Sequence, residues 1–278
     1  MSTQNTAKKK KGLGKVQWVL IVLCLCVFLF SGWKMLGINK NYQENEKTYN
    51  EIADFVLKTS YSETESELED DDVWPLEEFV RNQSVLIPAV DFDALLSINS
   101  GAVAWLYSPD TVINYPVAKG TDNDFYLNHA FNRRYDEFGA LFMDYRNAAD
   151  FSDRNTIIYG HHLKNGNMFA SLENYKDQAY YDAHPVIYMT TATGKFRLEI
   201  FAGYVCQATG EPYRLYFQND GVFGKWVDTA KSKSTFASDV QPAPTDRVVT
   251  LSTCVYDFNN ARYVVHCRLV ECEGGIWY

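Results

Sequence analysis

From about residue 84 onward, apolar and polar residues form short runs in which Tyr, Phe, Val and Ile recur, with Gly and Pro between them. Such runs, rich in β-branched and aromatic residues, are typical of β-strands. Eight segments show the pattern: VAWLYSP, INYPVAKG, ALFMDYR, NTIIYGHH, VIYMTT, FRLEIFAGYVCQ, RVVTLSTC and RYVVHCRLV. Eight strands with few helices predict a mainly β domain, folded as a closed or nearly closed barrel.

Helical spacing is limited to short segments. Between the predicted strands it occurs in DFDALLSI, DNDFYLNHAF, MFASLENY and GVFGKWVDTAKSK. Upstream, the apolar residues of segment 41–58 fall roughly on one face, which predicts another helix. Residues 60–72, SYSETESELEDDD, are acidic and poor in apolar residues, which favours a solvated linker. An exposed helix face is the alternative for the middle of that segment.

The N-terminal part contains a run of 18 uncharged residues, Val16 to Trp33, bounded by Lys15 and Lys34. At about 1.5 Å per residue, a helix of this length roughly spans the hydrocarbon core of a membrane. A secretory signal peptide is the alternative, but the following SGWKMLGINK has no good small-x-small cleavage site. We therefore predict an uncleaved anchor, with the basic flank in the cytoplasm and the rest of the chain outside.

These patterns predict four parts. They are a basic cytoplasmic tail (1–15), a transmembrane anchor (16–36), a helical and acidic stalk with N-terminal helices (37–83), and the β-barrel (84–278).

The charge is unevenly distributed. The chain has 26 basic and 35 acidic residues, and its formal charge is −9. Residues 1–40 hold seven lysines and no acidic residue, so the remainder carries 19 basic and 35 acidic groups, a formal charge of −16. A surface of this charge disfavours nucleic acid as a partner, since nucleic acid needs a basic footprint.

The six cysteines do not form a dense disulfide framework. Cys24 and Cys26 lie in the apolar run, where they act as small apolar residues. The remaining four are Cys206, Cys254, Cys267 and Cys272. A pair such as Cys267 with Cys272 stays possible. No CxxC or HExxH spacing supports a structural zinc site, and no metal or cofactor is predicted.

One cysteine has the surroundings that a nucleophile needs. Cys254 ends a predicted strand, and Arg262 begins the next one. A thiol needs a nearby histidine or positive charge to react as a thiolate at neutral pH. Arg262 could stabilise an oxyanion or hold a substrate carbonyl. An ordinary surface arginine at a turn is an equally good interpretation from this position alone.

The histidine partner is less clearly indicated. The chain has five histidines: His129, His161, His162, His184 and His266. His161 follows the strand-glycine segment NTIIYG, and so it lies at a strand end, as Cys254 does. His162 competes with it, because periodicity does not separate neighbours. His266 lies inside a strand, which favours a structural, hydrogen-bonded role. The two histidines in helical or loop segments receive no role.

Three blocks of sequence resemble the sortase family. TLSTC at 250–254 matches its TLxTC signature. GALFMDYRN (139–147), NTIIYGHHLKNGNMF (155–169) and TLSTCVYDFNNARYVVHCRLV (250–270) look most like class B sortases. The resemblance spans most of residues 85–270 and lies behind the predicted anchor.

The resemblance implies an eight-stranded sortase-type β-barrel. Class B members add N-terminal helices, for which 41–58 and 73–82 fit, and a helix before the seventh strand, for which 213–236 fits. Cys254 would be the nucleophile, and Arg262 the oxyanion or substrate arginine. The family places its histidine directly after the glycine, which selects His161 over His162 as acid/base.

The resemblance also implies a substrate groove. Ser252 and Thr253 of the signature would line it, together with Asn123 and Leu127 of DNDFYLNH. The turn between the cysteine and the arginine, VYDFNNA, is compact, so substrate contacts there could differ from those of other members.

The implied activity is that of the extracellular transpeptidases of Gram-positive bacteria. Such an enzyme cleaves the C-terminal sorting signal of a surface protein after Thr, through a thioacyl intermediate. It then joins the protein to an amine of a lipid-linked peptidoglycan precursor or of a pilin. Two alternatives are a cysteine protease that uses water and a tethered binding module with a dead site. The first is disfavoured because papain-like enzymes place the cysteine at a helix start and before the histidine.

Overall fold

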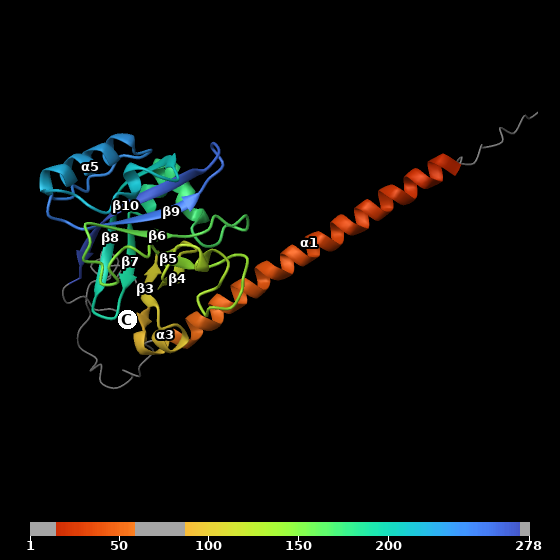
Figure 1. The fold of residues 1–278 in the computed structure, drawn as a ribbon, viewed down its shortest axis with the longest axis horizontal. Coiled ribbons are helices and arrows are strands. Elements are labelled where there is room, and N and C mark those ends of the chain that lie inside the picture. Colours follow the sequence, from red (N-terminus) through yellow and green to blue (C-terminus); the bar gives the residue numbers. More distant parts are fainter. Residues whose placement is uncertain (1–14, 59–86, 273–278) are drawn as a thin grey trace, which may run out of the picture. The chain divides into compact units, whose positions relative to one another are not determined.

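The computed structural model describes residues 15–58 and 87–272 (Figure 1). The acidic linker predicted at 60–72 and the second N-terminal helix predicted at 73–82 lie outside these residues. The described chain falls into two compact units, Met1–Lys47 and Thr48–Tyr278.

The N-terminal helix is a single long element. Helix α1, Lys15–Val56, contains both the apolar run and the segment expected to form a separate helix over 41–58. No proline interrupts it, and its two glycines, Gly32 and Gly37, lie in open space. Within the described residues, one helix is long and apolar enough to cross a membrane, with a mean hydropathy of 2.4 and none of that stretch buried. The helix ends at Val56, and Leu57–Lys58 form strand β1 instead of continuing it.

The second unit is built on a closed eight-stranded barrel. Its strands are β3 (Ala102–Tyr107), β4 (Asn114–Lys119), β5 (Leu141–Met143), β6 (Asn155–Tyr159), β7 (Val186–Thr190), β8 (Lys195–Gln207), β9 (Val248–Cys254) and β10 (Ala261–Glu271). Their order around the barrel is β10-β8-β7-β3-β4-β5-β6-β9. All eight predicted strands and the predicted closure are therefore confirmed.

Two of the pairings are parallel: β4 with β5, and β6 with β9. The β6 and β9 segments NTIIY and VVTLSTC are almost wholly buried. Burial on both faces fits the lack of a regular apolar–polar alternation in these two segments. Because parallel neighbours run in the same direction, β6 and β9 end at the same edge of the barrel.

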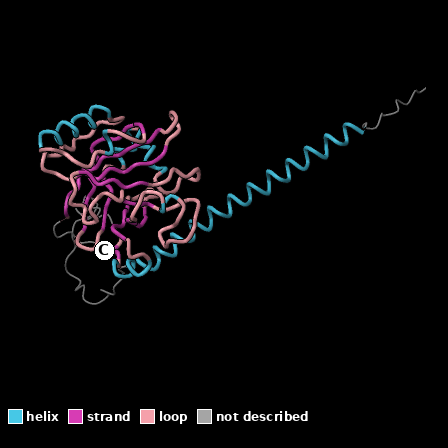
Figure 2. The backbone as a smooth tube through the Cα atoms, viewed as in Figure 1, coloured by secondary structure: helices cyan, strands magenta, loops and turns pink. Residues whose placement is uncertain are grey.

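Helix α5, Asp220–Lys233, precedes the seventh barrel strand, as the resemblance implied. Figure 2 shows this helix outside the strands. Asn219 caps its N-terminus, since its side chain accepts a hydrogen bond from the backbone N–H of Val222. Phe223, Trp226 and the other apolar residues at helical spacing pack on β8.

The remaining elements are short. They are β2 (Ala89–Val90), which pairs with β1, helices α3 (Phe92–Ile98) and α4 (Gln178–Ala183), and 3₁₀ turns η1 (Phe125–Leu127), η2 (Ala170–Lys176) and η3 (Glu211–Tyr213). The segment DNDFYLNHAF was expected to be a helix but forms only η1. Its Asp122 side chain accepts hydrogen bonds from the backbone N–H groups of Asp124 and Phe125, which favours a tight turn over a continuing helix. MFASLENY likewise forms 3₁₀ turns, and α4 was not predicted.

Candidate active site

The parallel pairing of β6 and β9 brings two distant chain segments to one edge. Tyr159, the last residue of β6, pairs with Ser252 of β9. The next backbone N–H, that of Gly160, donates to the Ser252 carbonyl at 3.1 Å. His161 and Cys254 each lie two residues beyond the pair Tyr159–Ser252. Strand geometry therefore brings both residues to the same edge of the barrel.

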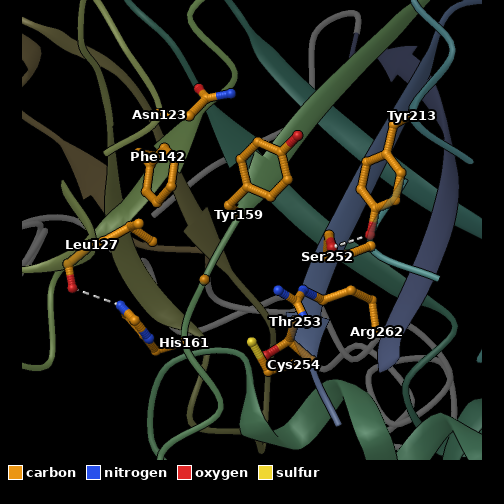
Figure 3. Close-up of a pocket in the computed structure, with 12 residues that line it drawn as sticks. Asn123, Leu127, Phe142, Tyr159, His161, Tyr213, Ser252, Thr253, Cys254 and Arg262 are labelled. Carbon is orange, nitrogen blue, oxygen red and sulfur yellow. Dashed lines mark hydrogen bonds between the residues drawn. The ribbon is translucent and has the colours of Figure 1, made fainter. Parts of the chain in front are cut away.

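A pocket of about 240 Å³ opens at this edge (Figure 3). All seven residues predicted for the site line it: Asn123, Leu127, His161, Ser252, Thr253, Cys254 and Arg262. Sequence reasoning missed five others: Phe142, Tyr159, Gly160, Ala208 and Tyr213. In the view of Figure 3, the Cys254 sulfur lies between the His161 ring and the Arg262 guanidinium.

The His161 ring is held by one backbone carbonyl. Its Nε2 lies 2.8 Å from the carbonyl oxygen of Leu127. A carbonyl can only accept, so Nε2 carries the proton, and Nδ1 is the acceptor in the neutral ring. The ring rests on Gly139, where an added Cβ would lie 3.0 Å from Cδ2 of the histidine. Gly139 also has a φ of +59°, a conformation that favours glycine.

The glycine before the histidine is required by packing. A Cβ on Gly160 would lie 2.4 Å from Leu141 Cδ2 and 2.5 Å from Phe169 Cδ2, both in the core. The neighbouring His162 does not line the pocket. Its Nε2 lies 2.8 Å from a carboxylate oxygen of Glu173. The structure thus brings His161, and not His162, to the cysteine.

Arg262 is placed by the antiparallel ladder between β9 and β10. It pairs directly with Cys254 on one side and with Cys206 of β8 on the other. Its Nη1 donates to the carbonyl of Ala261 at 3.0 Å. Within the described residues, no carboxylate forms an ion pair with its guanidinium, so the positive charge faces the pocket uncompensated.

The other thiols of the second unit have raised pKa values, which disfavour the reactive thiolate form. Burial raises the pKa of Cys206 to about 11, although a hydrogen bond with Tyr213 and the charge of Arg262 oppose the rise. Burial also raises the pKa of Cys267 and of Cys272. These last two cysteines are free, so the disulfide that stayed possible between them is not formed.

A buried hydrogen-bond network lies behind the pocket. The hydroxyl of Thr250, in the TLSTC segment, lies 2.6 Å from Asn155 Oδ1 and 2.8 Å from His266 Nδ1. His266 Nε2 lies 3.1 Å from the Tyr204 hydroxyl. Burial, and to a lesser extent Lys233, lowers the pKa of His266 to about 3, so its ring is neutral. The expected structural role of His266 as a hydrogen-bonded strand residue is confirmed.

The same network supports one wall of the pocket. Asn155 Nδ2 donates to the carbonyls of Pro212 and Arg214. These carbonyls flank Tyr213, whose hydroxyl lies 2.9 Å from Ser252 Oγ. Asn155 thereby holds η3 where Tyr213 can reach the pocket.

The opposite wall is supported by Asp144. Its carboxylate accepts hydrogen bonds from Asn123 Nδ2 at 3.1 Å, from the Tyr159 hydroxyl at 2.9 Å, and from the backbone N–H and two side-chain nitrogens of Arg146. Burial alone raises the pKa of Asp144, but the hydrogen bonds from Arg146 and Tyr159 outweigh burial and lower the pKa to about 2. Asn123 Oδ1 also accepts from the backbone N–H of Tyr145, so its side-chain orientation is fixed.

Comparison with known proteins identifies the fold. The Sortase domain family model matches residues 106–270. The chain is 33% identical to sortase B of Listeria monocytogenes over 265 residues, 95% of this chain and 99% of the relative. A Staphylococcus aureus sortase B–substrate complex matches with 36% identity and a TM-score of 0.63, covering 66% of this chain and 86% of that one. A sortase B complexed with triglycine matches with the same identity, TM-score and coverage.

The barrel, the cysteine-containing pocket and these matches define a class of enzyme. The chain belongs to the sortase family of cysteine transpeptidases. Within the family, its similarity to sortase B and the added helix α5 make it a class B sortase.

Proposed function

We propose that this sortase is anchored in a membrane and acts outside the cell. It would cleave a C-terminal sorting signal after Thr and join the protein to an amine. The single observation that carries this proposal is the pocket in which His161, Cys254 and Arg262 come together from three strand ends. The relatives bound to substrate and to triglycine support a peptide substrate and an amine acceptor.

In the first half-reaction, Cys254 acts as the nucleophile. Its sulfur bonds to the threonine carbonyl carbon, and the thiol proton passes to His161 Nδ1. Arg262 stabilises the oxyanion that forms; in other enzymes, removal of one such donor costs about 2.7–4 kcal/mol. The C–N bond then breaks, and His161 returns the proton to the departing amine. A thioacyl enzyme results.

In the second half-reaction, the acceptor amine attacks the thioacyl carbonyl. His161 takes a proton from the amine, the new amide forms, and the C–S bond breaks to restore Cys254. Two half-reactions on one thiol predict ping-pong kinetics. We infer that the acceptor belongs to a lipid-linked peptidoglycan precursor or to a pilin, because both present primary amines outside the membrane.

The substrate contacts follow from the pocket walls. Asn123 has a fixed amide at one wall, and Leu127 presents an apolar side chain that is 43% exposed. Ser252 and Thr253 form the floor next to the cysteine. These four residues would bind the sorting signal, and Tyr213, which hydrogen-bonds to Ser252, would border the same subsite.

The proposed topology assigns the four parts of the chain to compartments. Residues 1–15 would be a cytoplasmic tail, 16–36 the membrane anchor, 37–83 the stalk, and 84–278 the extracellular catalytic domain. The apolar length of α1 supports the anchor, and the lysines before the anchor support a cytoplasmic N-terminus.

The test uses the full-length protein in detergent and a panel of peptides that contain a Thr-Gly bond. Mass spectrometry follows the products with and without triglycine. We expect a thioacyl adduct on Cys254 and an amide product that requires the acceptor. Cys254→Ala should form neither, whereas Cys272→Ala, the matched control, should retain both.

The two alternatives give different results. Hydrolysis of the peptide at a rate that does not change when triglycine is added would identify a cysteine protease. Absence of any adduct on Cys254 with every peptide would favour a binding module with a dead site.

A further inference from the structure

A chain of side-chain contacts connects the segment after His161 to the loop after Cys254. His162 Nε2 lies 2.8 Å from Glu173 Oε2, and Glu173 Oε1 lies 2.8 Å from Lys176 Nζ. Lys176 Nζ also lies 2.8 and 3.0 Å from the two carboxylate oxygens of Asp257. We call these four residues the ion-pair chain.

The ends of the ion-pair chain lie close to the proposed catalytic residues. His162 directly follows His161, and Asp257 comes three residues after Cys254. A second contact runs alongside, because the ring of Tyr256 meets the His162 ring edge-on with centroids 5.6 Å apart. The loop that contains Tyr256 and Asp257 leads directly into Arg262.

The barrel alone leaves this region incompletely fixed. The pairing of β6 with β9 ends at Tyr159 and Ser252, before either His161 or Cys254 is reached. Cys254 is paired with β10 only, through Arg262. The loop beyond it is largely exposed, with Tyr256 73% accessible. The contact between Lys176 of η2 and Asp257 therefore restrains this loop, which strand pairing does not restrain.

The hydrogen bonds between Glu173 and Lys176 favour the charged forms of both groups. Hydrogen bonding by Lys176 lowers the pKa of Glu173. Burial tends to lower the pKa of Lys176, but hydrogen bonds with Asp257 and Glu173 outweigh burial and raise it. The side chains of Lys176, Glu173 and Asp257 are 32–37% exposed, so the ion pairs add little to overall stability. Their effect is on the position of the loop.

We propose that Lys176 is a positioning residue that holds the loop between Cys254 and Arg262 against the segment following His161. This inference rests on the proposed function. Lys176 joins Glu173 and Asp257 across a sequence separation of 81 residues between Lys176 and Asp257. It thereby sets the distance between the proposed nucleophile and the proposed acid/base without touching the substrate.

The test compares Lys176→Met, which keeps the aliphatic stem, with Asp257→Asn, which keeps the shape. Lys225→Met on α5 removes an equally long, exposed cation and is the matched control. Because small misplacements of reacting groups are costly, we expect Lys176→Met and Asp257→Asn each to lower kcat by roughly three- to tenfold, with KM within about twofold. The double variant Lys176→Met/Asp257→Asn should have a kcat no lower than that of the more impaired single variant, because both substitutions break the same contact. The charge exchange Lys176→Glu with Asp257→Lys should restore part of the rate.

A second measurement does not depend on transpeptidation. The rate of Cys254 alkylation by iodoacetamide, read from the mass of its peptide, should fall in Lys176→Met and Asp257→Asn but not in Lys225→Met. If the unaltered protein shows no turnover while alkylation changes in this way, the proposed function fails and the positioning role stands. The positioning role is refuted if the alkylation rate and kcat of Lys176→Met and Asp257→Asn both equal those of Lys225→Met. It is also refuted if the effects of Lys176→Met and Asp257→Asn on kcat simply add in the double variant.

Discussion

The buried hydroxyl of Thr250 allows a stringent test of how the TLSTC segment is held. Thr250→Val replaces the hydroxyl with a methyl group of similar size. The Asn155 Oδ1 acceptor and the His266 Nδ1 donor then lose their partner inside the barrel. Each buried polar group left without a partner costs about 1–3 kcal/mol, so we expect a loss of about 2–4 kcal/mol in the free energy of unfolding.

The chain provides a matched control for this substitution. Thr156 lies on the neighbouring strand β6, is equally buried, and has a hydroxyl with no hydrogen-bond partner in the described part of the chain. Thr156→Val therefore removes an unsatisfied group, and we expect it to be neutral or mildly stabilising. The two variants carry the same chemical change in the same barrel wall.

The assay is urea unfolding of the full-length protein in detergent, followed by tryptophan fluorescence. Trp226 reports on the surroundings of the network, because the centroid of its ring lies 5.1 Å from the centroid of the His266 ring. With a dependence on urea of about 1–3 kcal/mol/M, Thr250→Val should lower the midpoint by about 1–2 M. Equal midpoints for Thr250→Val and Thr156→Val would refute the view that the network stabilises the barrel.

Three further predictions concern individual residues. Burial lowers the pKa of His266 to about 3 in the folded protein. Between about pH 6.5 and pH 3, the unfolded chain therefore binds a proton at this residue that the folded protein does not bind. The free energy of unfolding should fall as the pH falls through this range, by up to about 1.4 kcal/mol per pH unit. Urea midpoints at several pH values should show a flatter acid limb for His266→Gln. Gly160→Ala forces a Cβ into Leu141 and Phe169, and peptide assays should show kcat/KM lowered by at least about tenfold. Arg262→Lys keeps the charge but loses the planar fork, so we expect kcat to fall by about 10²-fold; a near-native rate would make Arg262 a simple surface residue.

Much of the barrel could be predicted from sequence, because its strands have strong local signals. β6 and β9 are short segments rich in Val, Ile and Thr; Gly160 follows the first strand, and Cys254 ends the second. The continuity of α1 could not be predicted in the same way. Its apolar and amphipathic halves have different patterns of hydrophobic residues. Hydrophobic periodicity does not indicate whether one continuous helix spans both halves.

The candidate active site, like the fold, could be predicted from the sequence only in part. Strand-end positions indicated Cys254 and His161, but periodicity did not distinguish His161 from His162, and only the packing around Gly160 explains the arrangement. Tyr213 left no sequence signal, because its place depends on Asn155 holding η3 across 57 residues of chain. Contacts of this kind arise from tertiary hydrogen bonding, which local patterns do not encode.

The parallel pairing of β6 with β9 has a consequence for how activity is acquired during folding. Its two strands are separated by nearly ninety residues, and joining them requires closure of a long loop with its entropic cost. A chain in which this pairing has not formed keeps its thiol and its imidazole apart. Turnover therefore reports on a completed barrel, and partially folded forms should be catalytically silent.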